Sequence, residues 1–135
     1  MLKNHPYHDV GDALYSDDFD LAQELCHESL VIEEIDELYK GKEGILEEFT
    51  KWSGALSELA KDDYNITQYG DLVFMEGTLT GKHTKGDLKV RDRVLKPLGN
   101  SLEFKYVTVA ASKDGQLIRV THYYDQYGII KQLEK

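Results

Sequence analysis

The sequence predicts an α+β fold in which N-terminal helices pack on a strongly curved antiparallel sheet. Apolar residues recur at helical spacing up to Leu59, whereas from Tyr64 onward they alternate with polar residues as they do in strands. Turn-forming pairs such as Gly70-Asp71 and Gly86-Asp87 separate the alternating runs. Helices followed by closely spaced strands are typical of an α+β domain.

Three helices are expected in the N-terminal half. Residues 10–15 form a short first helix, and Ser16 or Asp17 offers an N-cap to a second over residues 18–28. That helix would bury a stripe of four residues: Phe19, Ala22, Leu25 and Cys26. The third helix spans residues 45–59, and a short strand lies around residues 29–34.

Five strands are expected in the second half, over residues 65–69, 72–85, 88–95, 102–112 and 117–133. Gly77 and Gly81 share one face of the second of these strands. Glycines inside a strand mark bends or a close approach by another group, so the sheet is expected to curve strongly there, concave toward the helices.

A hairpin is expected at Asp114-Gly115, a pair that suits the positive φ angles of a two-residue turn. If the strands carry no bulge, Tyr106 lies opposite Tyr123 and Thr108 opposite Thr121. Paired residues share a face. One face would then carry an aromatic and polar surface that suits a pocket: Phe104, Tyr106, Thr108, Thr121, Tyr123 and Asp125.

Composition narrows the function classes. The 135 residues fit one domain, 1–135, and no apolar run approaches the ~18 residues of a membrane span. A net charge of −9 opposes binding to nucleic acid or to an anionic membrane surface. With no signal-like N-terminus, a cytoplasmic location is expected. The lone Cys26 is expected to be a buried, inert thiol.

No metal site or cofactor is expected. The acidic run of residues 33–37 lacks the interleaved His or Gly of ordered metal loops, so a solvated surface is expected there. No phosphate loop, nucleophile elbow or zinc pattern occurs.

Several short motifs carry a resemblance to a known family. They are residues 39–45, residues 77–84, the turn Pro97-Leu98-Gly99, and the hairpin from Asp114 through Asp125. In order and type they resemble the nuclear transport factor 2-like superfamily, and within it the SnoaL-like polyketide cyclases and ketosteroid isomerase-like proteins. The resemblance implies a cone-shaped (cystatin-like) α+β barrel, cofactor-free chemistry and a homodimer formed through the outer sheet face.

The resemblance also implies site residues. Asp125 matches the acid/base aspartate of the cyclase-like relatives, and His83 matches their strand-end histidine. Tyr106 or Tyr123 would donate a hydrogen bond to an enolate oxygen. The alternatives are that Asp125 caps a strand end or accepts backbone hydrogen bonds, and that His83 is satisfied structurally at the rim.

The remaining candidates are contacts to a ligand. Thr108 and Thr121 belong to the hairpin face, and Trp52, Tyr15 and Phe74 are aromatic side chains that either line the pocket or pack in the core. His122 is expected on the opposite face from Asp125, at the surface or in an interface.

Two functions follow as hypotheses. The first is a cyclase, isomerase or lyase that acts on a small hydrophobic carbonyl compound, with Asp125 as general acid/base. The second is a non-catalytic dimeric module that holds a small ligand in the same cone. A pure interaction domain with a filled cone is a third possibility, which an internal cavity would exclude.

Overall fold

The computed structural model describes residues 5–134, which form one six-stranded sheet, a small hairpin and four helices. The strand order in the sheet is β2-β1-β8-β7-β4-β3, and all neighbours are antiparallel except β1 and β8. The strands are β1 (Cys26–Glu34), β2 (Glu37–Lys40), β3 (Leu56–Tyr69), β4 (Leu72–His83), β7 (Ser101–Lys113) and β8 (Gln116–Tyr124). The separate hairpin pairs β5 (Leu88–Val90) with β6 (Arg93–Leu95).

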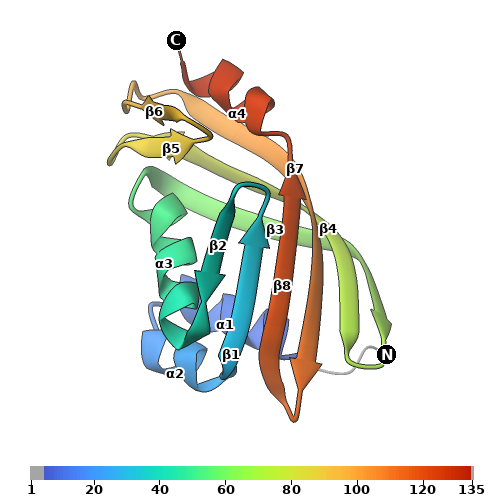
Figure 1. The fold of residues 1–135 in the computed structure, drawn as a ribbon. Coiled ribbons are helices and arrows are strands. Elements are labelled where there is room, and N and C mark those ends of the chain that lie inside the picture. The colour runs from blue at the N-terminus through green and yellow to red at the C-terminus, as the bar shows by residue number, and fades with distance from the viewer. Residues whose placement is uncertain (1–4, 135) are drawn as a thin grey trace.

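Helices cover the concave side of the sheet. Figure 1 shows α1 (Pro6–Tyr15), α2 (Phe19–Glu24) and α3 (Gly41–Ser53) inside the curve, while α4 (Gln126–Leu133) and the β5–β6 hairpin lie at one end of it. The α1 helix begins at Pro6, before the predicted start at residue 10, because Pro6 suits a first helical turn and the His5 ring accepts the backbone N–H of Tyr7 at 3.1 Å. No helix within residues 5–134 has both the length and the apolar composition needed to cross a membrane.

Gly77 shows why glycine occurs inside the bent strand β4. A Cβ at this position would lie 2.1 Å from the ring of Tyr106 on the neighbouring strand β7. The phenol end of the Tyr106 ring therefore occupies the space that a side chain at position 77 would fill. This close approach positions Tyr106 toward the interior.

Gly11 is a glycine that the fold does not require. It lies inside α1, where glycine costs about 1 kcal/mol relative to alanine. A Cβ there would have no described heavy atom within 4 Å beyond the backbone of its own helix. Neither packing nor backbone conformation explains the missing side chain.

Two clusters of buried apolar residues form the core. The first joins α1, α2 and the start of α3 to β1 and β8, and includes Ile32, Ile45 and Val120. The second joins the end of α3 to β7, α4 and the small hairpin, and includes Trp52 and Phe104. A cavity lies where these clusters meet.

The α+β class with a strongly curved sheet and three N-terminal helices is confirmed, but several boundaries differ. The predicted second helix ends early, so Cys26 lies in β1, where burial raises the pKa of its thiol to about 12. The third helix stops at Ser53 and a long β3 follows. Residues 126–133 form helix α4 rather than the end of a strand, because Asp125 caps a new helix.

The predicted register of the last hairpin is wrong by one residue. The register shifts between Ala111 and Ser112, so Tyr106 pairs with Tyr124, and Thr108 pairs with His122. Side chains alternate along a strand, and a shift of one residue exchanges the two faces. The concave face of β8 therefore carries His122 and Tyr124.

Candidate active site

A cavity of about 80 Å³ lies inside the curved sheet, between the two core clusters. Its apolar walls come from both clusters and include Leu14, Ile32, Trp52, Phe104 and Val120. Its polar lining is formed by Tyr7, Tyr15, Glu34, Glu48, Lys61, Tyr106, His122 and Tyr124. An apolar cavity with a few convergent polar groups is the usual form of a small-molecule site.

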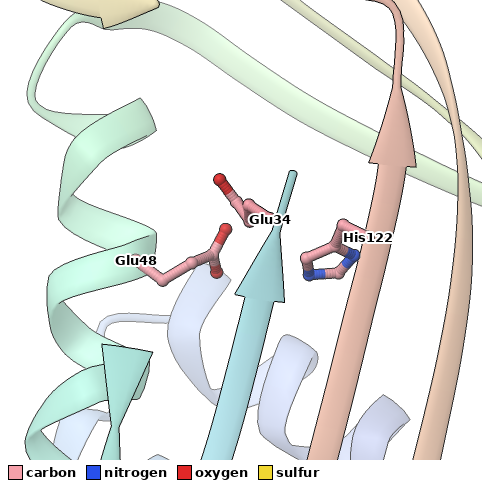
Figure 2. A group of neighbouring side chains, drawn as sticks. All are labelled: Glu34, Glu48 and His122. Atoms are coloured by element: carbon pink, nitrogen blue, oxygen red, sulfur yellow. The ribbon is translucent and has the colours of Figure 1, made fainter. Parts of the chain in front are cut away.

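Two glutamates and a histidine meet in this cavity. Glu34 stands at the end of β1, Glu48 projects from α3, and His122 comes from β8, and their side chains point into the space between these elements (Figure 2). One ligating atom from each lies within 4.8 Å of the other two. Glu34 is only 2% exposed, so this acidic group is held away from bulk water.

Glu34 has partners that stabilise its negative charge. The Tyr124 hydroxyl donates to its Oε1 at 3.1 Å, and the Lys51 ammonium lies 3.4 Å from the same atom. Lys51 also contacts Glu37, which is nearer the surface. The ionised form of Glu34 is thus compensated inside the protein.

The surroundings of the two glutamates shift their pKa values in opposite directions. Burial, followed by the negative charge of Glu34, raises the pKa of Glu48 well above its ordinary value. Burial would also raise the pKa of Glu34, but the hydrogen bond with Glu48 and the charge of Lys51 outweigh it and lower that pKa. These opposite shifts favour a state of the pair in which Glu48 keeps its proton and Glu34 is ionised.

His122 is neutral and fixed in orientation. Its Nδ1 lies 2.7 Å from the hydroxyl of the fully buried Thr108, its partner across the strands. Burial lowers the pKa of His122 to about 4, although the nearby charge of Glu34 opposes this shift. With Nδ1 engaged by Thr108, the other ring nitrogen is the one available to the glutamate pair or a ligand.

A second polar group stands at the other side of the cavity. The Lys61 ammonium donates to the Tyr7 hydroxyl at 2.6 Å and lies 3.7 Å from one carboxylate oxygen of Asp63. The other carboxylate oxygen of Asp63 accepts from the Tyr106 hydroxyl. Burial would lower the pKa of Lys61, but Tyr7 and Asp63 raise it above its ordinary value. Lys61 is therefore a fixed cation rather than an amine nucleophile.

Glu34, Glu48 and His122 are also the described residues that could hold a metal ion. The Lys51 ammonium already supplies positive charge to Glu34. A cation would compete with Lys51 and would have to displace the proton of Glu48. Lys51 thus compensates the negative charge of Glu34 without a metal ion.

The structure brings some of the predicted site residues together. Tyr15, Trp52 and Tyr106 line the cavity, and Thr108 lies directly behind His122. Trp52 packs with Phe104 and Tyr124 at ring distances of 5.3 and 5.8 Å. These aromatic rings form one end wall of the cavity.

Asp125 lies outside the cavity. Its side chain is exposed and accepts the backbone N–H of Gly128 at 3.1 Å as the N-cap of α4, so the alternative that it accepts backbone hydrogen bonds is confirmed. The register shift between β7 and β8 places Thr121 and Tyr123 on the convex face of the sheet. The expectation that these three residues line the pocket is wrong.

Two further candidates also lie elsewhere. His83 is fully buried and does not line the cavity; its Nε2 is 2.7 Å from the carbonyl of Gly86, and its Nδ1 has no hydrogen-bond partner among residues 5–134. Phe74 is 40% exposed on the convex face of β4. Neither can contact a ligand in the cavity as placed.

Sequence reasoning missed the acidic pair and assigned His122 to the outside. Glu34 was expected in a solvated run, yet it has the same parity as the buried Leu30 and Ile32 of β1. Glu48 stands three residues after Ile45 and four before Trp52, on the buried face of α3. The sequence signal for this pair is that each glutamate lies among the apolar residues on the buried face of its strand or helix.

The comparisons with known proteins agree with this architecture. The model of the SnoaL-like polyketide cyclase family matches residues 7–133. A candidate SnoaL-like polyketide cyclase from Jannaschia sp. CCS1 is 16% identical, with a TM-score of 0.78 over 98% of this chain and 97% of that chain. No curated protein matches the sequence.

Two other solved structures show how varied the proteins of this fold are. A protein from Catenulispora acidiphila with a ketosteroid isomerase-like fold, solved with trimethylamine, is 12% identical; its TM-score is 0.75 over 98% of this chain and 95% of that chain. An LEH-like epoxide hydrolase from M. tuberculosis is 19% identical, with a TM-score of 0.65 over 91% and 82%. At such identities the likeness shows the fold alone, while the family match covers nearly the whole chain: this protein belongs to the SnoaL-like polyketide cyclase family.

Proposed function

We propose that the protein is a cofactor-free enzyme that moves a proton on a small hydrophobic carbonyl compound, as a cyclase, isomerase or lyase does. The observation that carries the proposal is the Glu34–Glu48 pair in the cavity, whose surroundings push the two pKa values in opposite directions. Titratable groups separated in this way mark a base and an acid within one site.

The pair supplies both groups that enolisation requires. The ionised carboxylate accepts a proton from the carbon next to the substrate carbonyl, and the neutral carboxyl donates a hydrogen bond to the carbonyl oxygen as negative charge develops. Return of the proton to another carbon gives an isomerase. Attack by the enolate carbon on a second carbonyl gives a cyclase, and loss of a leaving group gives a lyase.

Three neighbouring groups support this chemistry. Lys51 and the Tyr124 hydroxyl keep Glu34 ionised until it takes the proton. Because the Tyr7 hydroxyl accepts from Lys61, its own proton can be donated to a ligand oxygen. The apolar walls exclude water and strengthen each of these interactions.

Deuterium exchange tests the proposal without knowledge of the natural substrate. Cyclohexanone in D₂O is followed by proton NMR, with the protein as catalyst. We expect exchange at the carbons beside the carbonyl to exceed the buffer rate, and Glu34→Gln to lower the added rate by about 100-fold. Asp125→Asn is the matched control and should retain the wild-type rate.

Two results would contradict the proposed role of the glutamate pair. Wild-type protein that adds nothing to the buffer rate, or a loss in Asp125→Asn as large as in Glu34→Gln, would remove the pair from the mechanism. Dialysis against a chelator before the assay should leave the rate unchanged, since the pair acts without a metal ion.

A second candidate function is binding of a small ligand without catalysis. The aromatic end wall formed by Trp52, Phe104 and Tyr124 suits a small organic cation, because the faces of aromatic rings attract positive charge. The relative from Catenulispora acidiphila was solved with trimethylamine. Calorimetry with trimethylammonium chloride would show binding that weakens in both Glu34→Gln and Trp52→Leu, with no proton exchange on cyclohexanone.

The proposal includes a cytoplasmic location and a homodimer that joins the convex sheet faces. Leu72, Phe74, Val107 and Tyr123 are exposed on that face, and Val107 pairs with Tyr123 across the strands. Light scattering after size exclusion should show a dimer for the wild-type protein and a monomer for Val107→Glu. A monomeric wild-type protein would contradict the dimer.

A further inference from the structure

We propose that ligands reach the cavity through an opening between α1 and β3, and that Gly11 keeps this opening free and limits the size of what passes. A catalyst and a binding protein would both need such an opening to the cavity.

The opening is where two hollows meet. Outside the cavity, a surface depression of about 330 Å³ is lined by residues of α1 and β3: Tyr7, His8, Gly11, Asp12, Tyr15, Leu59, Ala60, Lys61 and Asp63. Tyr7, Gly11, Tyr15 and Lys61 line both this depression and the cavity. These four shared residues are therefore the wall between the cavity and the surface.

Three of the four form one stripe on α1. Tyr7, Gly11 and Tyr15 are spaced four residues apart, which places them above one another on the same face of the helix. The two tyrosine rings thus flank a position that has no side chain. The stripe leaves a gap at Gly11, between two aromatic rings.

The two rings differ in how firmly they are held. Tyr7 is buried and its hydroxyl is bonded to Lys61 from β3. Tyr15 is 40% exposed, more than any other residue that lines the cavity, and its ring contacts Phe49 at 5.2 Å. The gap therefore has one fixed side and one side that faces water.

The absent side chain of Gly11 has no structural cause. Its backbone is helical rather than left-handed, and a side chain at this position would meet open space. Glycine inside a helix is unfavourable, so its presence at the wall of the cavity is explained by access rather than by folding.

The other end of the cavity is closed. Trp52 and Phe104 there belong to the same buried cluster as Ile129, Ile130 and Leu133 of α4. The β5–β6 hairpin contributes Leu88 and Leu95 to this cluster, so a ligand at that end would have to displace the core.

Trp52 offers a direct measure of access, because it is the single tryptophan of the chain and lines the cavity. Its fluorescence can be quenched by acrylamide, a small neutral molecule, in the folded protein at neutral pH. Gly11→Leu fills the gap with an apolar side chain. Asp9→Leu is the matched control, because Asp9 lies on α1 but lines neither hollow.

We expect acrylamide to quench wild-type Trp52, the quenching constant to fall severalfold in Gly11→Leu, and the Asp9→Leu protein to resemble the wild type. Gly11→Ala should quench at an intermediate level and raise the melting temperature by about 4 °C, since alanine favours the helix. A melting curve of Gly11→Leu as sharp as that of the wild type shows that the variant is folded.

Three results would overturn the proposal. They are a wild-type protein whose Trp52 acrylamide does not quench, equal quenching in Gly11→Leu and wild type, and an equal loss in Asp9→Leu. The assay involves no turnover, so failure of the proton-exchange test would leave this result standing, and failure here would leave the role of the glutamate pair standing.

Discussion

The start of α4 and the centre of the cavity both contain carboxyl groups, but in opposite surroundings. Asp125 at the start of α4 is exposed, and its oxygen accepts a backbone N–H as a helix cap. Glu34 and Glu48 meet inside the protein, where Glu34 is 2% exposed and is held by Lys51 and Tyr124. The contrast indicates that burial and hydrogen-bond partners, rather than position at the end of a strand, shift the pKa of a carboxyl group.

The largest difference between the two regions should appear in stability. Glu34→Gln removes the charge that Lys51 and Tyr124 compensate, and leaves Lys51 with Glu37 alone. Breaking a buried ion pair from one side should lower the free energy of unfolding by about 3 kcal/mol. Urea unfolding at pH 7 measures this change. A cost no larger than that of losing a helix cap would place Glu34 on a par with Asp125.

The free energy of unfolding at acidic pH should depend on His122. Its pKa falls from 6.5 in the unfolded chain to about 4 in the folded protein. Between these values the unfolded chain binds the proton and the folded protein does not, so this contribution to stability is complete above pH 6.5 and is lost on acidification toward pH 4. The loss amounts to about 3 kcal/mol at most.

His122→Asn isolates that contribution from the other titrating groups. The difference in unfolding free energy between wild type and variant should shrink steadily from pH 7 to pH 4. A difference that stays constant over this range would mean that His122 titrates alike in the folded and unfolded states.

Asp125 should show the smallest effect, one confined to stability. Asp125→Ala removes the side-chain acceptor for the N–H of Gly128 and should cost about 1 kcal/mol at neutral pH. Ligand binding and proton exchange should be unchanged when assayed well below the melting temperature. A loss of activity in this folded variant would restore Asp125 to the site and contradict the distinction between the two regions.

More of the fold than of the candidate site could be predicted from the sequence. The change from helical to alternating periodicity and the turn pairs predicted the α+β class, since these patterns are local. One irregularity between Ala111 and Ser112 then exchanged the faces of β8 and moved His122 inward and Tyr123 outward. A bulge depends on how neighbouring strands fit together, so the turn pair alone could not predict it.

The acidic pair was harder to predict for a different reason. Glu34, Glu48 and His122 come from β1, α3 and β8, and no sequence spacing relates them. Each could be suspected alone as a polar residue in an apolar stripe, but their meeting is a property of the packed structure. The candidates that did reach the cavity, Trp52, Tyr15 and Tyr106, are aromatic residues placed by its walls.

The most direct test of the glutamate pair is the protonation state of Glu48 at neutral pH. Infrared difference spectra of the wild-type and Glu48→Gln proteins at pH 7 should reveal the carbonyl absorption of a neutral carboxyl group, present only in the wild type. Asp125→Asn should leave that absorption in place. Spectra in which every carboxyl group is ionised at pH 7 would contradict the account, because the cavity would then hold two like charges and no acid.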